Sequence, residues 1–303
     1  MDLTTKVYGG PGKITDVDGV IHVEGPIVVT PKPVYRDNMS AVGGKGPKVL
    51  VDLTVEIAFT PMPVWNSTYR GVLFPTAFYN FTAIGGRMVG TSNRAVSIQG
   101  TDAQGFTFTR ARLTKMPDIY LGLGKPLYGP AVITAYIGTG KALSDADAFG
   151  AVNTTAWDQS DFPTAWQEAQ CQLALGILTG WDTVNAEDGF QLTHELESEA
   201  AKMGQITVDQ RIQAYRAKIE FRPEQPTTAQ LLANMVGGNI GVIGTRTSAN
   251  NNSAVITGSG ISVTAANMAI EESSLMWDAK SQRHGPVTLR TAQITPATRL
   301  TLA

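Results

Sequence analysis

The stretch VLVDLTVEIAFTP (residues 49–61) indicates a β-strand, because apolar and polar side chains alternate along it until a proline ends it. Alternation with a period of two is typical of a strand that has one face in a core and the other in a polar environment. The expected core face holds Val49, Val51, Leu53, Val55, Ile57 and Phe59. The segment RIQAYRAKIEFRP (211–223) repeats the pattern later in the chain, with the same Ile-x-Phe-x-Pro ending. We expect Arg211, Gln213, Tyr215, Ala217, Ile219 and Phe221 on its core face.

Other segments recur in the same order along the chain, which one chance echo would not produce. The pairs are IVVTPKPV (27–34) with FQLTHELE (190–197), STYRGVLFP (67–75) with TTAQLLANM (227–235), NRAVSIQG (93–100) with NSAVITGSG (252–260), GFTFTRARL (105–113) with GISVTAANM (260–268), and YGPAVITAYI (128–137) with HGPVTLRTAQI (284–294). Ordered recurrence indicates tandem duplication, and 303 residues suit two domains of about 150 each. We therefore place one domain at 1–155 and a second at 156–303, with a linker at 138–165.

Both domains are expected to be all-β with short helices, because short alternating runs are separated by Gly and Pro. Helices are expected after the proline of each long strand, where a hydroxyl residue suits a helix cap. The run AWQEAQCQLALGIL (165–178) fits a helix or a strand. Two polar segments, 35–48 and 198–210, predict long loops between the first two strands of each unit, which are either functional or disordered excursions.

Composition and charge restrict the class of protein. A hydrophobic fraction of 43% is ordinary for a globular chain. Without a long apolar run or a signal-like N-terminus, we predict no membrane span and no export. The single Cys171 predicts no internal disulfide. Residues 1–160 hold 14 Lys and Arg against 12 Asp and Glu, and the rest hold 10 against 14, which is too weak a positive charge for stable nucleic-acid binding.

Motifs for catalysis or metal binding do not emerge from the sequence. His22, His194 and His284 have no second ligand at metal-binding spacing. The Gly-Lys pair of GGPGKIT (9–15) lacks the Ser or Thr of a phosphate loop, and DADAFG (145–150) lacks later ligands of a calcium loop. We therefore expect a chain that is not an enzyme, with no cofactor and no metal.

The order of elements resembles the tail tube (major tail) proteins of long-tailed bacteriophages and the related tubes of contractile injection systems. That order is a strand, a long hairpin loop, an alternating strand ending in Ile-x-Phe-x-Pro, a short capped helix and further strands. The segments that carry the resemblance are residues 48–75, from KVLVDL to GVLFP, residues 87–140, from RMVGTS to YIGTG, and residues 189–235, from GFQLTH to LLANM.

The resemblance implies a fold, an assembly and partners. Each domain would be a β-sandwich flanked by a helix, and the sheets of neighbouring domains would join into an inner β-barrel around a lumen. Most members carry one tube domain and form six-membered rings, so this two-domain chain is expected to form a homotrimer with pseudo-sixfold symmetry, or a hexamer as the alternative. The chain would be a virion protein of a siphovirus tail, made in the bacterial host cytoplasm. Its expected partners are the tape-measure protein in the lumen, the tail terminator and distal tail proteins at the ends, and DNA that passes without specific binding.

Candidate interface residues follow from the loops and from one strand. Contacts between rings or subunits are predicted at Arg36, Asp37, Lys45, Lys48, Glu199 and Lys202. Glu195 and Glu197 alternate with apolar residues and are predicted to face the lumen, a solvated outer edge being the alternative. Rival functions are a baseplate or distal-tail ring protein, and a two-domain β-sandwich binding module at the tail tip. The scattered positions of Trp65, Trp181 and Trp277 disfavour the binding module.

Overall fold

The computed structural model describes residues 6–8, 11–37, 46–79, 87–88, 94–100, 105–136, 151–153, 162–175, 184–224, 252–277, 282–291 and 300–303. In this part of the chain strands dominate, and the two helices are short, so the all-β prediction is confirmed at the level of fold class. Below, the first half means residues 1–155 and the second half residues 156–303.

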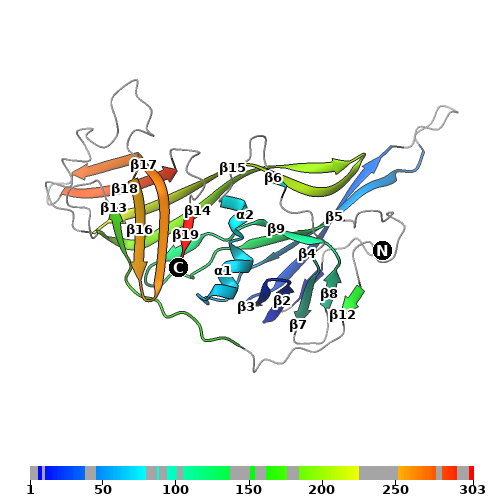
Figure 1. Cartoon of the computed structure of the whole chain (residues 1–303), viewed down its shortest axis with the longest axis horizontal. Helices are drawn as coiled ribbons and strands as arrows, with labels where there is room; N and C mark the ends of the chain where they lie inside the picture. The colour runs from blue at the N-terminus through cyan, green and yellow to red at the C-terminus, as the bar shows by residue number, and fades with distance from the viewer. Residues whose placement is uncertain are drawn as a thin grey trace, which may run out of the picture.

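The first half contains two five-stranded antiparallel sheets (Figure 1). The order of the first sheet is β1 (Lys6–Tyr8), β4 (Ile27–Arg36), β5 (Val49–Phe59), β11 (Ala131–Ala135) and β9 (Ala111–Lys115). The order of the second sheet is β12 (Ala151–Asn153), β8 (Gly105–Phe108), β7 (Val96–Gly100), β2 (Gly12–Asp16) and β3 (Gly19–Val23). Side chains of both sheets belong to one buried cluster, with Ile14, Ile57 and Ile98 fully enclosed.

In the described part of the second half a single nine-stranded sheet takes the place of the expected second pair of sheets. Its strands are β13 (Gln172–Leu175), β14 (Val184–Met203), β15 (Ile206–Pro223), β16 (Asn252–Gly258), β17 (Ile261–Trp277), β18 (Gln282–Thr291) and β19 (Leu300–Leu302), joined by β6 (Arg87–Met88) and β10 (Ile119–Leu121) of the first half. Because β14 pairs with both β15 and β13, the pairings β13-β16-β17-β18-β15-β14 close on themselves. The continuous strand β17 lies where the first half has the separate strands β8 and β9, and this continuity makes one sheet out of two.

The long hairpins of the two halves have the same register. All nine residue pairs of β4 with β5 recur between β14 and β15, with positions 28–36 of β4 matching 191–199 of β14 and positions 49–58 of β5 matching 211–220 of β15. For example, Lys32 opposite Thr54 corresponds to Glu195 opposite Arg216. The recurrence includes a β-bulge, in which one strand has an extra residue. The extra residue is Val51 in β5 and Gln213 in β15, which are matching positions of the two strands.

The remaining strands follow the same plan. The pairs of β5 with β11 match those of β15 with β18, and β11 with β9 matches β18 with β17. A second bulge recurs here, with Thr114 as the extra residue in β9 and Glu271 in β17. The strands β12-β8-β7-β2 also match β19-β17-β16-β13. The two halves thus share one order of pairing, whereas the boundary at 155/156 stays a prediction.

The bulges correct the predicted core faces. Leu53, Val55, Ile57 and Phe59 are buried as predicted, but Val49 is 41% exposed. Because the bulge at Val51 interrupts the alternation, Asp52, which was expected on the polar face, is only 3% exposed. In β15, Tyr215, Ala217, Ile219 and Phe221 are buried as predicted. Before the bulge the alternation is reversed, so Ile212 is buried and the predicted core residues Arg211 and Gln213 are exposed.

The predicted loop at 198–210 is wrong. Strand β14 continues to Met203 and β15 starts at Ile206, so this segment is the end of a long hairpin with a two-residue turn. Gly204 has a φ of +65°, which suits such a turn. The polar composition misled because most side chains at the end of this hairpin are exposed, and the polar residues that are not, such as Asp209, have polar partners in the first half. In the first half β4 ends at Arg36 and β5 begins at Val49, and residues 38–45 of that predicted loop lie outside the described residues.

The two helices are α1 (Ser67–Leu73) and α2 (Thr76–Tyr79). The predicted helix after the first proline is therefore confirmed, but its cap is Asn66, whose side chain accepts from the backbone N–H of Tyr69. The counterpart at 227–235 lies outside the described residues. The run at 165–178 contains the strand β13, and the expected linker at 138–165 contains β12, which pairs with β8.

Candidate functional site

The two long hairpins project toward the same end of the molecule and lie together there (Figure 1). Of the predicted contact residues, Arg36, Asp37 and Lys48 are exposed at the end of β4–β5. Glu199 and Lys202 are exposed on β14, and Lys45 lies outside the described residues. The structure therefore brings the two predicted groups to one end of the protein, on neighbouring hairpins.

A buried carboxylate joins the hairpins. Asp52 Oδ2 accepts hydrogen bonds from the backbone N–H of Thr207, at 3.1 Å, and from its hydroxyl, at 2.6 Å. Asp52 Oδ1 accepts from the backbone N–H of Leu53. A buried carboxylate needs such donors, because an uncompensated charge in the interior is costly. The second hairpin is thus fastened to the bulged part of β5.

An ion pair reinforces this attachment. Arg110, just before β9, lies 3.5 Å from the carboxylate of Asp209 on β15, and both side chains are almost fully buried. Arg112 is also buried, and burial lowers its pKa, an effect that the nearby Asp209 opposes. The charges of the first half therefore face a carboxylate of the second half in a low-dielectric environment, where the partners must stay together.

Aromatic side chains form the middle of the junction between the halves. The Phe74 ring lies 5.3 Å from the His194 ring, and Tyr79 lies 5.8 Å from Tyr215, measured between centroids. His194 Nδ1 lies 2.8 Å from the Tyr215 hydroxyl. Burial lowers the pKa of His194 to about 3, so the imidazole is neutral at physiological pH. The end of α1 and the following helix thereby cover the inner face of the β14–β15 hairpin.

Two short strands of the first half extend the sheet of the second half. β10 pairs with residues 190–192 of β14, and β6 pairs with Arg211 and Ile212 of β15. Just before β10 in the sequence, the carboxylate of Asp118 accepts a hydrogen bond from the backbone N–H of His194. Burial raises the pKa of Asp118, and this bond opposes the rise. The junction therefore includes backbone pairing as well as side-chain packing.

Two of the acidic residues on β14, Glu195 and Glu199, are paired with bases. Glu195 forms an ion pair with Arg290 of β18 at 3.0 Å, and Arg290 also contacts Glu271 of β17. Glu199 lies 3.6 Å from Arg211. The first half has the opposite arrangement at the matching positions, since Lys32, the counterpart of Glu195, pairs with Glu56. This face therefore has mixed charge, because the facing strands supply cations beside the acidic residues of β14, and the prediction that Glu195 and Glu197 face a lumen stays a prediction.

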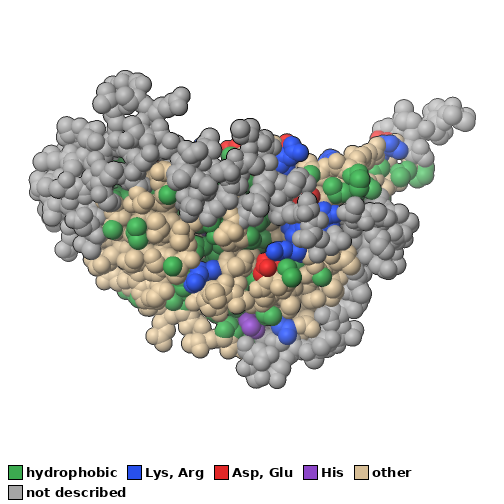
Figure 2. Space-filling view, viewed as in Figure 1, with side chains coloured by type: hydrophobic (Ala, Val, Ile, Leu, Met, Phe, Trp, Pro, Cys, Tyr) green, Lys and Arg blue, Asp and Glu red, His purple; other side chains and the backbone are tan. Residues whose placement is uncertain are grey.

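Exposed apolar side chains gather at the end of the molecule toward which the hairpins project (Figure 2). Val34 is 51% exposed, Tyr35 47% and Val49 41%. Their register counterparts in the second half are the polar residues Glu197, Ser198 and Arg211. The first hairpin therefore exposes apolar side chains at positions where the second has polar ones. Exposed apolar side chains that gather in one region are typical of a contact site for another protein.

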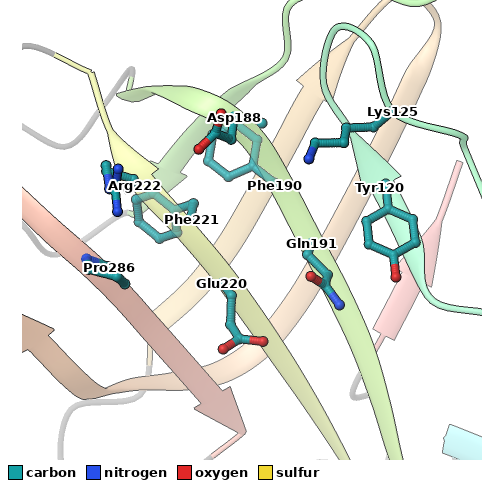
Figure 3. Close-up of a pocket in the computed structure, with 10 residues that line it drawn as sticks. Tyr120, Lys125, Asp188, Phe190, Gln191, Glu220, Phe221, Arg222 and Pro286 are labelled. Carbon is teal, nitrogen blue, oxygen red and sulfur yellow. The ribbon is translucent and has the colours of Figure 1, made fainter.

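A shallow pocket lies where β10, β14 and β15 meet (Figure 3). Charged side chains of both signs surround it, with Phe190 and Phe221 between them: Lys125, Asp188, Glu220 and Arg222. Arg222 forms an ion pair with Glu187 at 3.6 Å. Among the described residues no group of three or more His, Cys, Asp or Glu side chains is placed to hold a metal. Cys171 is buried, and burial raises the pKa of its thiol.

Sequence reasoning missed the residues that join the halves. These are Asp52, Phe74, Tyr79, Arg110, Thr207 and Asp209. A signal was present for Asp52, which is a carboxylate in the middle of an apolar strand. The partners of these residues lie far along the chain, in the other half, so the sequence offers no way to pair them.

No protein-family model matches the sequence, and no curated protein matches it. No helix within the described ranges is long and apolar enough to cross a membrane.

Proposed function

We propose that this chain is a virion structural protein that forms the stacked rings of a long phage tail tube, through which DNA leaves the particle. The observation that carries the proposal is the shared register of the two halves, bulges included. A chain with two copies of one pairing plan can place them in equivalent positions around an axis. Three chains then supply six repeats, which is the pseudo-sixfold arrangement expected of a two-repeat tube subunit.

The junction within the chain supports this arrangement. Strands of the first half continue onto the sheet of the second, so neighbouring repeats join by backbone pairing. Repeating the junction between chains would close a wall and remove open sheet edges, which otherwise promote aggregation. In this proposal the face that carries Lys32 and Glu195 lines the lumen, and its paired charges fit a conduit, because balanced charge does not hold a phosphate backbone. In this proposal the tape-measure protein fills the lumen, and the terminator and distal tail proteins close the ends.

The projecting hairpins would supply the contacts between stacked rings. Their charged residues Arg36, Asp37, Lys48, Glu199 and Lys202 are exposed and lie at one end of the molecule. Contacts at one end of a ring are those that a stack needs. The apolar side chains of Val34 and Tyr35 would add contact area in the same place.

Electron microscopy of the purified chain tests the proposal. We expect hollow rings and tubes for the wild type. Combined reversal of Arg36→Glu and Lys48→Glu should leave rings but impair their stacking, because the bases at the hairpin end would become acids. Lys125→Glu, an exposed lysine beside the pocket, is the matched control and should leave tubes intact. Discrete rings from the wild type would point to a distal-tail ring protein, and single chains without a channel would refute the proposal.

A further inference from the structure

Each long hairpin carries a three-residue strand on its outer edge, and the two short strands occupy the same register. β1 pairs with β4 through Lys6 with Val29, Val7 with Val28 and Tyr8 with Ile27. β10 pairs with β14 through Ile119 with Leu192, Tyr120 with Gln191 and Leu121 with Phe190. Positions 27–29 of β4 are the counterparts of 190–192 of β14, in the same correspondence that relates the rest of the two hairpins.

The two short strands come from different sources. β10 belongs to the repeat that precedes β14 in the chain, so it is the neighbouring repeat that covers this edge. β1 precedes β4 within the same repeat. The edge of the first repeat is therefore covered by a strand of the same repeat, at the place where the edge of the second repeat is covered by a strand of the neighbouring repeat.

The remaining outer edge of β4 cannot accept a longer strand. The hydroxyl of Thr291, on β18, accepts a hydrogen bond from the backbone N–H of Ala217 and donates one to its C=O. Both backbone groups of Ala217 therefore point toward β18 and away from β14. The facing residue His194 must then direct its own N–H outward, where Asp118 accepts it. The counterparts of His194 and Leu196 in β4 are Pro31 and Pro33, which have no N–H to offer. Pairing on this edge is confined to the stretch that β1 occupies.

We propose that residues 27–29 of β4 are the docking edge for a second copy of this chain, and that β1 covers this edge until the copy binds. The second half of one copy would supply a strand to β4 of the next, as the first half supplies β10 to β14 within one chain. β1 leaves when that strand arrives. Three residue pairs hold β1, so its release is far easier than opening a full-length strand pair. This inference rests on the proposed ring.

A disulfide lock tests the displacement of β1. In a Cys171→Ala background, Val7→Cys with Val28→Cys would tie β1 to β4, since facing residues of an antiparallel pair lie within disulfide reach. The matched control, Tyr120→Cys with Gln191→Cys, ties β10 to β14 at the same register. Assembly is followed by light scattering after gel filtration and by negative-stain images, with and without reductant.

We expect the oxidised β1 lock to remain as single chains and to assemble after reduction, while the β10 lock assembles in both states. Removal of residues 1–10 should allow assembly at lower protein concentration, because the edge is then open. Assembly of the oxidised β1 lock at the same rate as the reduced form would overturn the inference and leave the ring proposal standing. Failure of the oxidised β10 lock to assemble would overturn it as well, because the effect would not be specific to β1. If the wild type does not assemble either, the ring proposal falls and the inference falls with it.

Discussion

The attachment of the second hairpin to β5 gives the sharpest energetic prediction. Asp52→Asn keeps the shape of the side chain and its acceptor for Leu53, but puts an amide NH₂ where Oδ2 accepts two hydrogen bonds from Thr207. Hydrogen bonds to a charged group contribute about 1.5–3 kcal/mol each. The Thr207 hydroxyl can turn and accept from the new amide, so we expect the free energy of unfolding to fall by about 2–4 kcal/mol.

A double-mutant cycle isolates the contact. Thr207→Val removes the hydroxyl, and the pair of substitutions should show a coupling of about 1–2 kcal/mol in urea unfolding followed by tryptophan fluorescence. Glu56→Gln on the same strand is the control. Its ion pair with Lys32 has both side chains about half exposed, so its loss should change stability by no more than about 0.5 kcal/mol. A coupling of zero between positions 52 and 207 would refute the attachment of the hairpin to β5.

Three further predictions concern the junction, the turn and the thiol. Because burial lowers the pKa of His194 to about 3, the unfolded chain binds a proton there that the folded chain does not, so wild-type stability should fall as pH drops below about 6.5, by up to about 1.4 kcal/mol per pH unit from this group. His194→Phe should remove that part of the slope in urea titrations at pH 7, 6 and 5, and an unchanged slope would contradict a buried neutral imidazole. Gly204→Ala should cost about 1 kcal/mol through its φ of +65° alone, whereas Gly25→Ala, at an equally open position without positive φ, should be neutral; equal effects would show that the turn differs from the structure. Cys171 should react with a thiol reagent only after unfolding, and fast labelling of the native chain would contradict its burial.

The strand pattern of the long hairpins was predictable because side-chain alternation reports burial directly. The echo between 49–61 and 211–223 corresponds to β5 and β15, which share register and bulge. The bulges themselves could not be predicted from the sequence. An extra residue shifts the alternation of inward and outward side chains only next to the bulge, and the rest of each strand keeps a regular pattern. For this reason the sequence placed Val49 and Gln213 inward and Asp52 outward.

The candidate site was predictable only in outline. The charged residues at the hairpin ends are local features, and their polar segments predicted long loops, of which the one at 198–210 is strand in the structure. The contacts that hold the hairpins together join distant parts of the chain, as Arg110 with Asp209 and Phe74 with His194 do. The closed sheet of the second half depends on a short contact between β13 and β14 that leaves no pattern in the sequence.

In the proposed ring, the two repeats of one pairing plan take equivalent places around a closed wall. Native mass spectrometry combined with class averages of the purified chain tests it most directly. We expect a hollow particle with six similar lobes and a mass three times that of the 32.3 kDa chain. A particle with the mass of one chain at every concentration, or one without a central channel, would contradict it.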